Sequence, residues 1–191
     1  MNELERNIAA LFEVKSEDLK TISAHFHAID LQKGDYFFKE HGYSNQLGFV
    51  KSGLLREWVT LPEKEVTKWV ATPGYFITDL NSFLFDKPAG SSLQALTDCE
   101  LYVISKEDYR NMGKSIPTWN TVEKLFMAKC FATMSDRILA FISMTAEERY
   151  LQLWSSNKEL FNQVPLQYLA SMLGMTPETF SRLRKKMTAI S

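Results

Sequence analysis

The clearest structural signal in this sequence is the stretch from Val164 to Lys186, VPLQYLASMLGMTPETFSRLRKK. Apolar residues recur along it at the spacing of two short helices: Leu166, Leu169, Ala170 and Leu173, then Phe180, Leu183 and Met187. Between the two sets, Gly174 supplies the backbone freedom to leave a helix in a left-handed conformation. Thr176 can cap the second helix through its hydroxyl, and Pro177 suits the first helical position. The stretch therefore predicts two helices joined by a tight turn.

The second of these helices carries a cluster of positive charge. Its outward face is predicted to hold Glu178, Ser181, Arg182 and Lys185, flanked by Arg184 and Lys186. Residues 165–191 contain four cations and one anion, whereas the whole chain has a net charge of −1. Positive charge is thus concentrated where a phosphate backbone would be met. The pattern predicts a helix-turn-helix whose second helix enters the DNA major groove. The alternative is a surface-exposed helical hairpin with a charged face.

The composition indicates a protein with packed cores. Of the 191 residues, 45% are hydrophobic, which argues against disorder. Cys99 and Cys130 are too few and too far apart for a disulfide framework or a CxxC metal site. No apolar run has the length of a membrane span, and the N-terminus, with Glu3, Glu5 and Arg6, is unlike a signal peptide. We therefore expect a cytoplasmic protein that does not bind a membrane.

The first half of the chain changes from helical to strand-forming patterns. Short helices are predicted over residues 3–13 and 16–28. From residue 29 to 104, short apolar stretches alternate with turn signals such as Lys51-Ser52-Gly53 and Thr72-Pro73-Gly74. This spacing is typical of a sandwich or barrel of the jelly-roll kind. Ser105, with Asp108 three residues on, is then expected to cap a short helix.

A long helix is predicted to connect this part to the helix-turn-helix. It begins at Pro117 and ends near Ser143 or Met144, because Thr145-Ala146-Glu147-Glu148 is a capping box that starts a new helix. Its apolar residues follow steps of four and three, typical of a coiled-coil seam: Met127, Phe131, Met134, Ile138 and Phe141. The seam predicts a homodimer, and the alternative is a helix that packs its apolar stripe on its own domain.

The predicted fold class is therefore α+β. A jelly-roll or β-roll sensor domain is expected over residues 1–115, a long dimerisation helix over 116–144, and a helix-turn-helix DNA-binding domain over 145–191.

This order of parts resembles the Crp/Fnr family of bacterial transcription regulators. The most similar segments are Leu96-Thr97-Asp98-Cys99-Glu100-Leu101, which looks like the family's turn into the last roll strand, and the stretch from Met172 to Arg182. The segment Glu147-Glu148-Arg149-Tyr150-Leu151 looks most like the Bacteroidetes branch. The resemblance implies a homodimer that binds double-stranded DNA near promoters and acts on RNA polymerase. The chain stops about five residues after Lys186, so we expect no winged hairpin there.

The resemblance also assigns roles within the predicted recognition helix. Glu178 and Arg182 match the two family positions that contact base edges, and arginine can bind guanine while glutamate accepts from cytosine. At a third base-reading position this chain has Pro177, so we expect its half-site to differ from that of the cyclic-AMP receptor. The candidates for phosphate contacts are Thr176, Ser181, Arg184, Lys185 and Lys186. Thr179 completes the predicted DNA-binding set.

The predicted sensor site departs from the pattern of the cyclic-nucleotide binders. Thr78 and Asp79 replace the family's Gly-Glu pair, and Ala89 stands where a phosphate-binding arginine is expected. Loss of that arginine removes a charge-assisted contact to an anion, which argues against cyclic AMP. The candidate pocket residues are Phe76, Asp79, Ser91 and Ser92, with Ser135 on the long helix. Two interpretations stay open: a pocket for an unidentified small-molecule effector, and an effector-free pocket collapsed around Phe76.

Other chemistries have little support in the sequence. Two cysteines cannot supply the four ligands of an iron–sulfur cluster. His25 and His27 are predicted to lie at the end of a helix without a partner glutamate and histidine, so we expect no metal and no cofactor. Cys130 is either a redox switch or a packing residue. No nucleophile–base pair or paired-carboxylate site is evident, so we expect a non-enzyme. The alternative function is a small-ligand or cyclic-nucleotide binding module whose helical tail contacts a protein partner.

Overall fold

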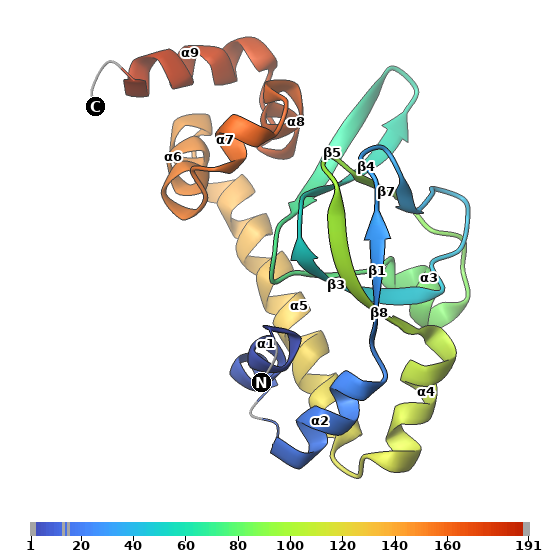
Figure 1. The fold of residues 1–191 in the computed structure, drawn as a ribbon. Helices are drawn as coiled ribbons and strands as arrows, with labels where there is room; N and C mark the ends of the chain where they lie inside the picture. Colours follow the sequence, from blue (N-terminus) through green and yellow to red (C-terminus); the bar gives the residue numbers. More distant parts are fainter. Residues whose placement is uncertain (1–2, 13, 15, 189–191) are drawn as a thin grey trace.

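Two antiparallel sheets form the centre of the molecule, which is described by a computed structural model over residues 3–12, 14 and 16–188 (Figure 1). One sheet has the strand order β1-β8-β3-β6 and the other has the order β2-β7-β4-β5. The strands are β1 (His27–Leu31), β2 (Tyr36–Phe38), β3 (Gln46–Ser52), β4 (Leu55–Leu61), β5 (Lys64–Ala71), β6 (Phe76–Ile77), β7 (Ser92–Ala95) and β8 (Cys99–Ser105). The predicted α+β fold with a β-roll is confirmed.

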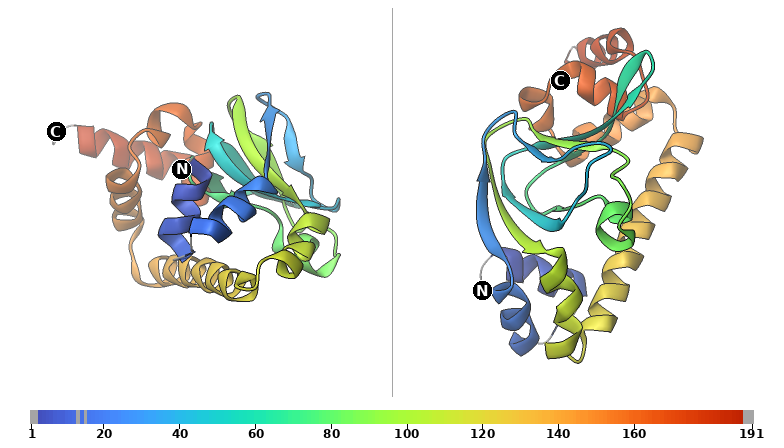
Figure 2. Two further views of the ribbon diagram at one scale, coloured as in Figure 1. Left: turned by 60° about the horizontal axis from the view of Figure 1, so that its bottom comes forward. Right: turned by 90° about the vertical axis from the view of Figure 1, so that its right-hand side faces the viewer.

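Helices surround this roll and extend beyond it. They are α1 (Glu3–Phe12), α2 (Ser16–Ala24), α3 (Leu80–Phe85), α4 (Lys106–Ser115), α5 (Trp119–Ser143), α6 (Ala146–Ser156), α7 (Leu160–Gln163), α8 (Leu166–Met172) and α9 (Pro177–Thr188). The long helix α5 runs along the side of the roll. It joins the end that carries α1, α2 and α4 to the end that carries α6 to α9 (Figures 1 and 2).

The roll is closed by an apolar core between its sheets. Val50, Leu55 and Val103 are among its fully buried residues, and Cys99 lies with them. The sharp turn between β3 and β4 requires Gly53, which has φ +89°. A Cβ atom there would lie 2.4 Å from the carbonyl oxygen of Asp98. The predicted turn at Lys51-Ser52-Gly53 is therefore needed both for its backbone angle and for the close approach of the chain before β8.

Two further apolar clusters attach helices to the roll. In the first, α1, α2, α4 and the start of α5 pack on β3 and β8, with Phe49, Met112 and Ile116 fully buried. In the second, Tyr150 of α6 packs edge to face against Phe161 of α7 and Phe180 of α9. Leu54 and Val70 of the roll belong to this second cluster, so the C-terminal helices are packed against the roll.

The predicted helix boundaries hold where a capping signal marks them. The Ser105 hydroxyl accepts a hydrogen bond from the Asp108 amide at 3.0 Å, and α4 follows. Both halves of the capping box form at Thr145, where α6 begins, and α5 ends at Ser143 as expected. The predicted start at Pro117 is two residues early, because α5 begins at Trp119.

The structure corrects the prediction for residues 16–28. The helix ends at Ala24, and His27 and Ala28 already belong to β1, paired with Val103 and Tyr102 of β8. His25-Phe26-His27 thus crosses from a helix into a strand. Propensity alone did not mark this boundary, because it depends on pairing with a distant strand. The short helices α3 and α7 were not predicted either.

Candidate functional site

The unit formed by α8 and α9, called here the α8–α9 unit, has the turn geometry that the sequence predicts. Gly174 adopts φ +66° after α8 ends. The Thr176 hydroxyl accepts a hydrogen bond from the Thr179 amide at 3.2 Å and so caps α9. Ala170 is fully buried, and Phe180 is 1% exposed. The apolar stripes of both helices therefore face inward, and the outer face of α9 is left to polar residues.

The outer face of α9 gathers the side chains predicted to contact DNA. Glu178, Arg182, Arg184, Lys185 and Lys186 are exposed, and Thr179 and Ser181 are half-buried. A shallow groove of about 600 Å³ is lined by Leu166, Pro177, Glu178, Ser181, Arg182 and Lys185. The predicted i, i+3, i+4, i+7 face is thus one continuous surface.

Glu178 and Lys186 of α9 also have partners within the chain. Hydrogen bonds from its own backbone N–H and from the Thr176 hydroxyl hold the pKa of the Glu178 carboxyl below its usual range. Glu178 is therefore ionised and can only accept hydrogen bonds at neutral pH. The Lys186 ammonium contacts both carboxylate oxygens of Glu147 on α6, at 2.7 and 3.0 Å. Such an exposed ion pair is weak, so Lys186 can exchange Glu147 for another anion.

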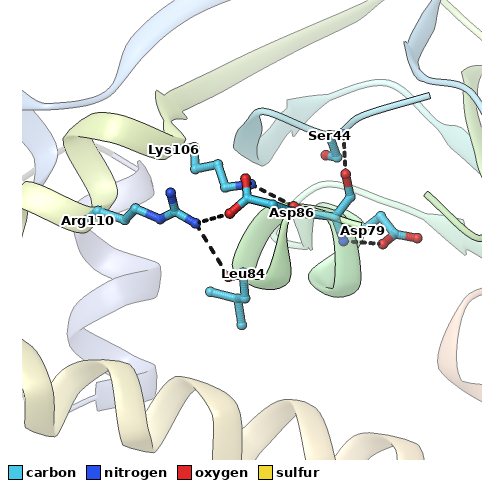
Figure 3. A network of polar contacts seen from close by, with 7 residues as sticks. Ser44, Asp79, Leu84, Asp86, Lys106 and Arg110 are labelled. Atoms are coloured by element: carbon cyan, nitrogen blue, oxygen red, sulfur yellow. Dashed lines mark hydrogen bonds and ion pairs between the residues drawn. The ribbon is translucent and has the colours of Figure 1, made fainter. Parts of the chain in front are cut away.

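Asp79, predicted to line an effector pocket, instead bonds to backbone amides of its own chain (Figure 3). Its carboxylate caps α3: one oxygen accepts from the Ser82 amide at 2.9 Å, and the other accepts from the Gly90 amide at 3.0 Å. Asp79 is 9% exposed. An anion of the chain itself thus occupies the N-terminus of α3 and uses the backbone donors around it. The same carboxylate would repel an incoming phosphate.

Most of the other predicted pocket residues are engaged by contacts within the chain. The Ser91 hydroxyl is fully buried and donates to Glu57 at 2.7 Å, while Ser92 accepts from the Glu40 amide at 3.0 Å. Phe76 packs between the rings of Phe49 and Phe126, with centroid distances of 5.1 and 5.4 Å. Ser135 is exposed on α5. Phe76 therefore belongs to the apolar cluster under α5, as in the collapsed interpretation.

A polar network beside α3 was not predicted from the sequence. The buried Lys106 ammonium donates to the Ser82 carbonyl at 2.7 Å and contacts Asp86 at 2.6 Å. Arg110 joins Asp86 from the other side at 2.7 Å (Figure 3). The two cations hold the pKa of the Asp86 carboxyl below its usual value. This network fixes the end of α3 on α4. Nothing in the sequence marks it, because Lys106 is one charge among many until α3 and α4 come together.

An exposed apolar face lies along the second half of α5. Phe131 is 77% exposed and Ile138 is 55% exposed, with Met134 similar; Met127 is half-buried. Because an α-helix turns about 100° per residue, Ile142 follows Phe131 and Ile138 on this face, whereas Phe141 is rotated by about 80° from Phe131. Ile142 is 79% exposed.

Phe141 instead faces the chain's own C-terminal helices. The Arg149 guanidinium lies 5.0 Å from its ring centroid. A Cβ atom on Gly174 would lie 2.7 Å from the Phe141 ring. The predicted seam therefore continues to Ile142, and Phe141 contacts the turn of the α8–α9 unit.

The remaining candidate ligands are dispersed. Over the described part of the chain, no three His, Cys, Asp or Glu side chains are grouped to hold a metal ion. Burial raises the pKa of both cysteine thiols, Cys99 and Cys130, which disfavours the reactive thiolate. None of the helices in this part is long and apolar enough to cross a membrane.

Comparison with known proteins gives the class of the roll. Residues 28–115 match the family model of the cyclic nucleotide-binding domain. This range contains all of the roll after the first residue of β1, together with α3 and α4. It is less than half of the chain, so it describes the N-terminal part alone. No curated protein matches the chain in sequence.

Solved structures match nearly the whole chain in fold. The catabolite activator protein of Thermus thermophilus is 20% identical, with a TM-score of 0.60 over 96% of this chain and 87% of that one. The c-di-GMP-responsive global regulator CLP of Xanthomonas campestris is 18% identical, with a TM-score of 0.69 over 92% of each chain. FixK2 of Bradyrhizobium japonicum is 15% identical, with a TM-score of 0.71 over 86% of this chain and 85% of that one. The chain therefore has the fold of Crp/Fnr-type regulators.

Proposed function

We propose that this protein is a sequence-specific, DNA-binding transcription regulator of the Crp/Fnr type that acts in the cytoplasm as a homodimer. The observation that carries the proposal is the outer face of α9, where Arg182, Lys185 and Glu178 line one open groove after a capped glycine turn. In this proposal the α8–α9 unit is a helix-turn-helix, and α9 is its recognition helix. Arginine and glutamate are residues that contact base edges, and the flanking cations suit phosphates.

The homodimer is proposed to form through the exposed face of α5. Phe131, Ile138 and Ile142 follow one another along that face, and each is more than half exposed. Large apolar side chains that share a helix face are typical of an interface between copies. A two-fold axis along α5 would present two α9 helices to successive major grooves. Contact with RNA polymerase is proposed from the family resemblance.

Cyclic AMP is not the proposed effector. The Asp79 carboxylate is held by the amides of Ser82 and Gly90, and Ala89, at the position of the family's arginine, is 1% exposed. No positive side chain is thus available at that position to pair with a cyclic phosphate. If a small molecule regulates this protein, we expect it to bind elsewhere.

Salt-dependent DNA binding tests the proposed function. Anisotropy of a labelled random duplex is measured with the full chain over a range of salt concentrations. Each phosphate contact contributes about one unit to the slope of log K against log salt. Lys185→Ala should therefore flatten the slope by about one unit. Lys114→Ala, which removes an exposed cation at the end of α4, is the matched control and should leave the slope unchanged.

The result that would overturn the proposal is weak binding whose slope does not respond to Lys185→Ala. In that case the helical tail is better explained as a surface for a protein partner, and the roll as a ligand-binding module.

A further inference from the structure

A cavity that the proposed function does not explain lies between the roll and the C-terminal helices. A cavity of about 510 Å³ opens where β5, α5, α6 and α8 meet. Its walls are mainly apolar and include Trp69, Tyr75, Phe141 and Leu173. Two cations, Arg137 of α5 and Arg149 of α6, line the same space. The volume and the mixture of apolar walls with a few polar groups are typical of small-molecule sites.

The two arginines are held in place by rings and carbonyls. The Arg137 guanidinium lies 4.9 Å from the Trp69 ring centroid and 5.7 Å from that of Phe141. The Arg149 guanidinium lies 5.0 Å from the Phe141 ring centroid. Its Nε donates to the Leu173 carbonyl at 3.0 Å and its Nη1 donates to the Met144 carbonyl at 2.6 Å. Both guanidinium groups are thus oriented before any ligand arrives.

Neither guanidinium group forms an ion pair within the described part of the chain, and Glu57 attracts Arg137 only at longer range. Over the described residues, no carboxylate lies within 4 Å of either guanidinium group. Asp136 also lines the cavity but is exposed, and Glu57 is engaged by Lys68 and Ser91. Arg137 makes one long hydrogen bond, from Nη2 to the Met172 carbonyl at 3.4 Å. Most of its N–H donors are therefore available, and burial lowers the pKa of this half-buried group.

We propose that this cavity is a binding site for a small aromatic organic anion, whose carboxylate or phosphate group is bound by Arg137 and Arg149. A guanidinium fork matches both kinds of anion geometrically. The ring of the ligand would pack against Trp69, Tyr75 and Phe141. This site is separate from the predicted pocket in the roll, whose residues are Asp79, Ser91 and Ser92.

A ligand in this cavity would touch several parts of the molecule at once. Trp69 and Tyr75 belong to the roll, Arg137 to α5, and Leu173 to the end of α8. Its affinity therefore depends on how the α8–α9 unit sits on the roll, and binding shifts that arrangement by linkage. The regulatory consequence rests on the proposed function, whereas the binding site does not.

Calorimetry on the purified full chain tests the site. One set of probes is carboxylates, namely benzoate, phenylacetate and indole-3-acetate. A second set is phenyl phosphate and inorganic phosphate, and the neutral controls are benzamide and phenylacetamide. We expect an aromatic anion to bind at least about tenfold more tightly than its neutral analogue, since hydrogen bonds to charged groups are that strong. The set that binds identifies the head group as a carboxylate or a phosphate.

Two variants with different effects locate the binding. Arg137→Gln removes one guanidinium and should weaken anion binding at least about tenfold. Ala140→Phe keeps both arginines and fills the cavity from α5, so it should abolish binding of every aromatic probe. Arg110→Gln removes an exposed guanidinium on α4 and is the matched control. The thermal unfolding of each variant shows that it is folded.

The proposal is overturned if no anion binds the folded chain more tightly than its neutral analogue at millimolar concentration. It is also overturned if binding survives both Arg137→Gln and Ala140→Phe. DNA binding measured separately distinguishes the two proposals. If the chain binds the anion but not DNA, the binding site is supported and the proposed function is not. If the chain binds DNA but no anion, the proposed function is supported and the binding site is not.

Discussion

Gly174 combines two structural requirements at a single residue. It has φ +66°, and a Cβ atom there would lie 2.7 Å from the Phe141 ring. A left-handed backbone costs a non-glycine residue roughly 1–2 kcal/mol. The side chain of Phe141 would also have to move, and it contacts Arg149. This turn therefore fixes α9 relative to α5 as well as to α8.

We predict that Gly174→Ala lowers the free energy of unfolding by more than the backbone term alone, roughly 2 kcal/mol or more. Urea unfolding of the full chain measures this change. Gly34→Ala is the matched control, because Gly34 also has a positive φ, +97°, but has no atom within 4 Å of its Cβ position. Equal losses for the two variants would show that the contact with Phe141 is unimportant.

Arg182 is exposed on the open face of α9 and is predicted to contact a base. Arg182→Ala should weaken binding to the preferred duplex by roughly 1–3 kcal/mol and relax base preference at one half-site position. Lys185→Ala, as a phosphate contact, should weaken binding to all sequences alike. Anisotropy on preferred and random duplexes separates the two effects. The base-reading role of Arg182 is contradicted by equal losses on both duplexes.

At the scale of elements, capping residues determine where α5 ends and α6 begins. The Glu148 carboxylate accepts from the Thr145 amide at 2.7 Å and from the Thr145 hydroxyl at 2.9 Å. These bonds hold the pKa of Glu148 below its usual value. A group with a lowered pKa in the folded state contributes stability above its unfolded pKa, about 4.3 for glutamate, and loses it as the pH falls through its folded value.

We predict that Thr145→Ala reduces the free energy of unfolding by about 1 kcal/mol at pH 7. The stability difference between wild type and Glu148→Gln should shrink as the pH is lowered below about 4. Chemical unfolding at pH 7 and at pH 3 measures both effects. If the difference in the free energy of unfolding between wild type and Glu148→Gln is the same at both pH values, the Glu148 carboxylate is not its source.

The exposed face of α5 is the element on which the proposed dimer depends. Phe131→Glu and Ile138→Glu place charges in an apolar surface, so each should convert the dimer to a monomer. Sedimentation velocity measures this change from dimer to monomer. Leu61→Glu is the control, because Leu61 is an exposed apolar residue, 44% exposed, at the β4–β5 turn. An unchanged sedimentation coefficient in both α5 variants would refute the assignment of this face as the dimer interface.

Much of this element structure was predictable because its signals are local. The turn at Gly174, the caps at Ser105, Thr145 and Thr176, and the end of α5 at Ser143 follow from residues within a few positions of each other. The end of α2, the helix α3 and the inward turn of Asp79 depend on segments brought together by the fold. Helix geometry alone turns Phe141 away from Phe131 and Ile138, but its contact with the Gly174 turn depends on where α8 packs.

At the scale of the whole molecule, α8 is docked on the roll by specific contacts. The Arg56 guanidinium lies 3.7 Å from the centroid of the Tyr168 ring, and the Thr67 amide donates to the Ser171 hydroxyl at 2.9 Å. Arg56 is 4% exposed and is also bound to Thr67 and Glu65. Together with the contact between Phe141 and the Gly174 turn, this docking sets the direction of α9 relative to α5. In a two-fold dimer along α5, it would therefore set the distance between the two recognition helices.

We propose that two α9 helices, held in this way, bind two half-sites of DNA. Selection of bound duplexes from a random pool by the purified full chain tests it most directly. We expect enrichment of an inverted repeat with half-sites about one helical turn apart, ~34 Å, and loss of base preference at one position of each half-site with Arg182→Ala. The proposal is contradicted if folded, dimeric protein enriches no sequence. It is also contradicted if Arg182→Ala leaves the enriched sequence unchanged.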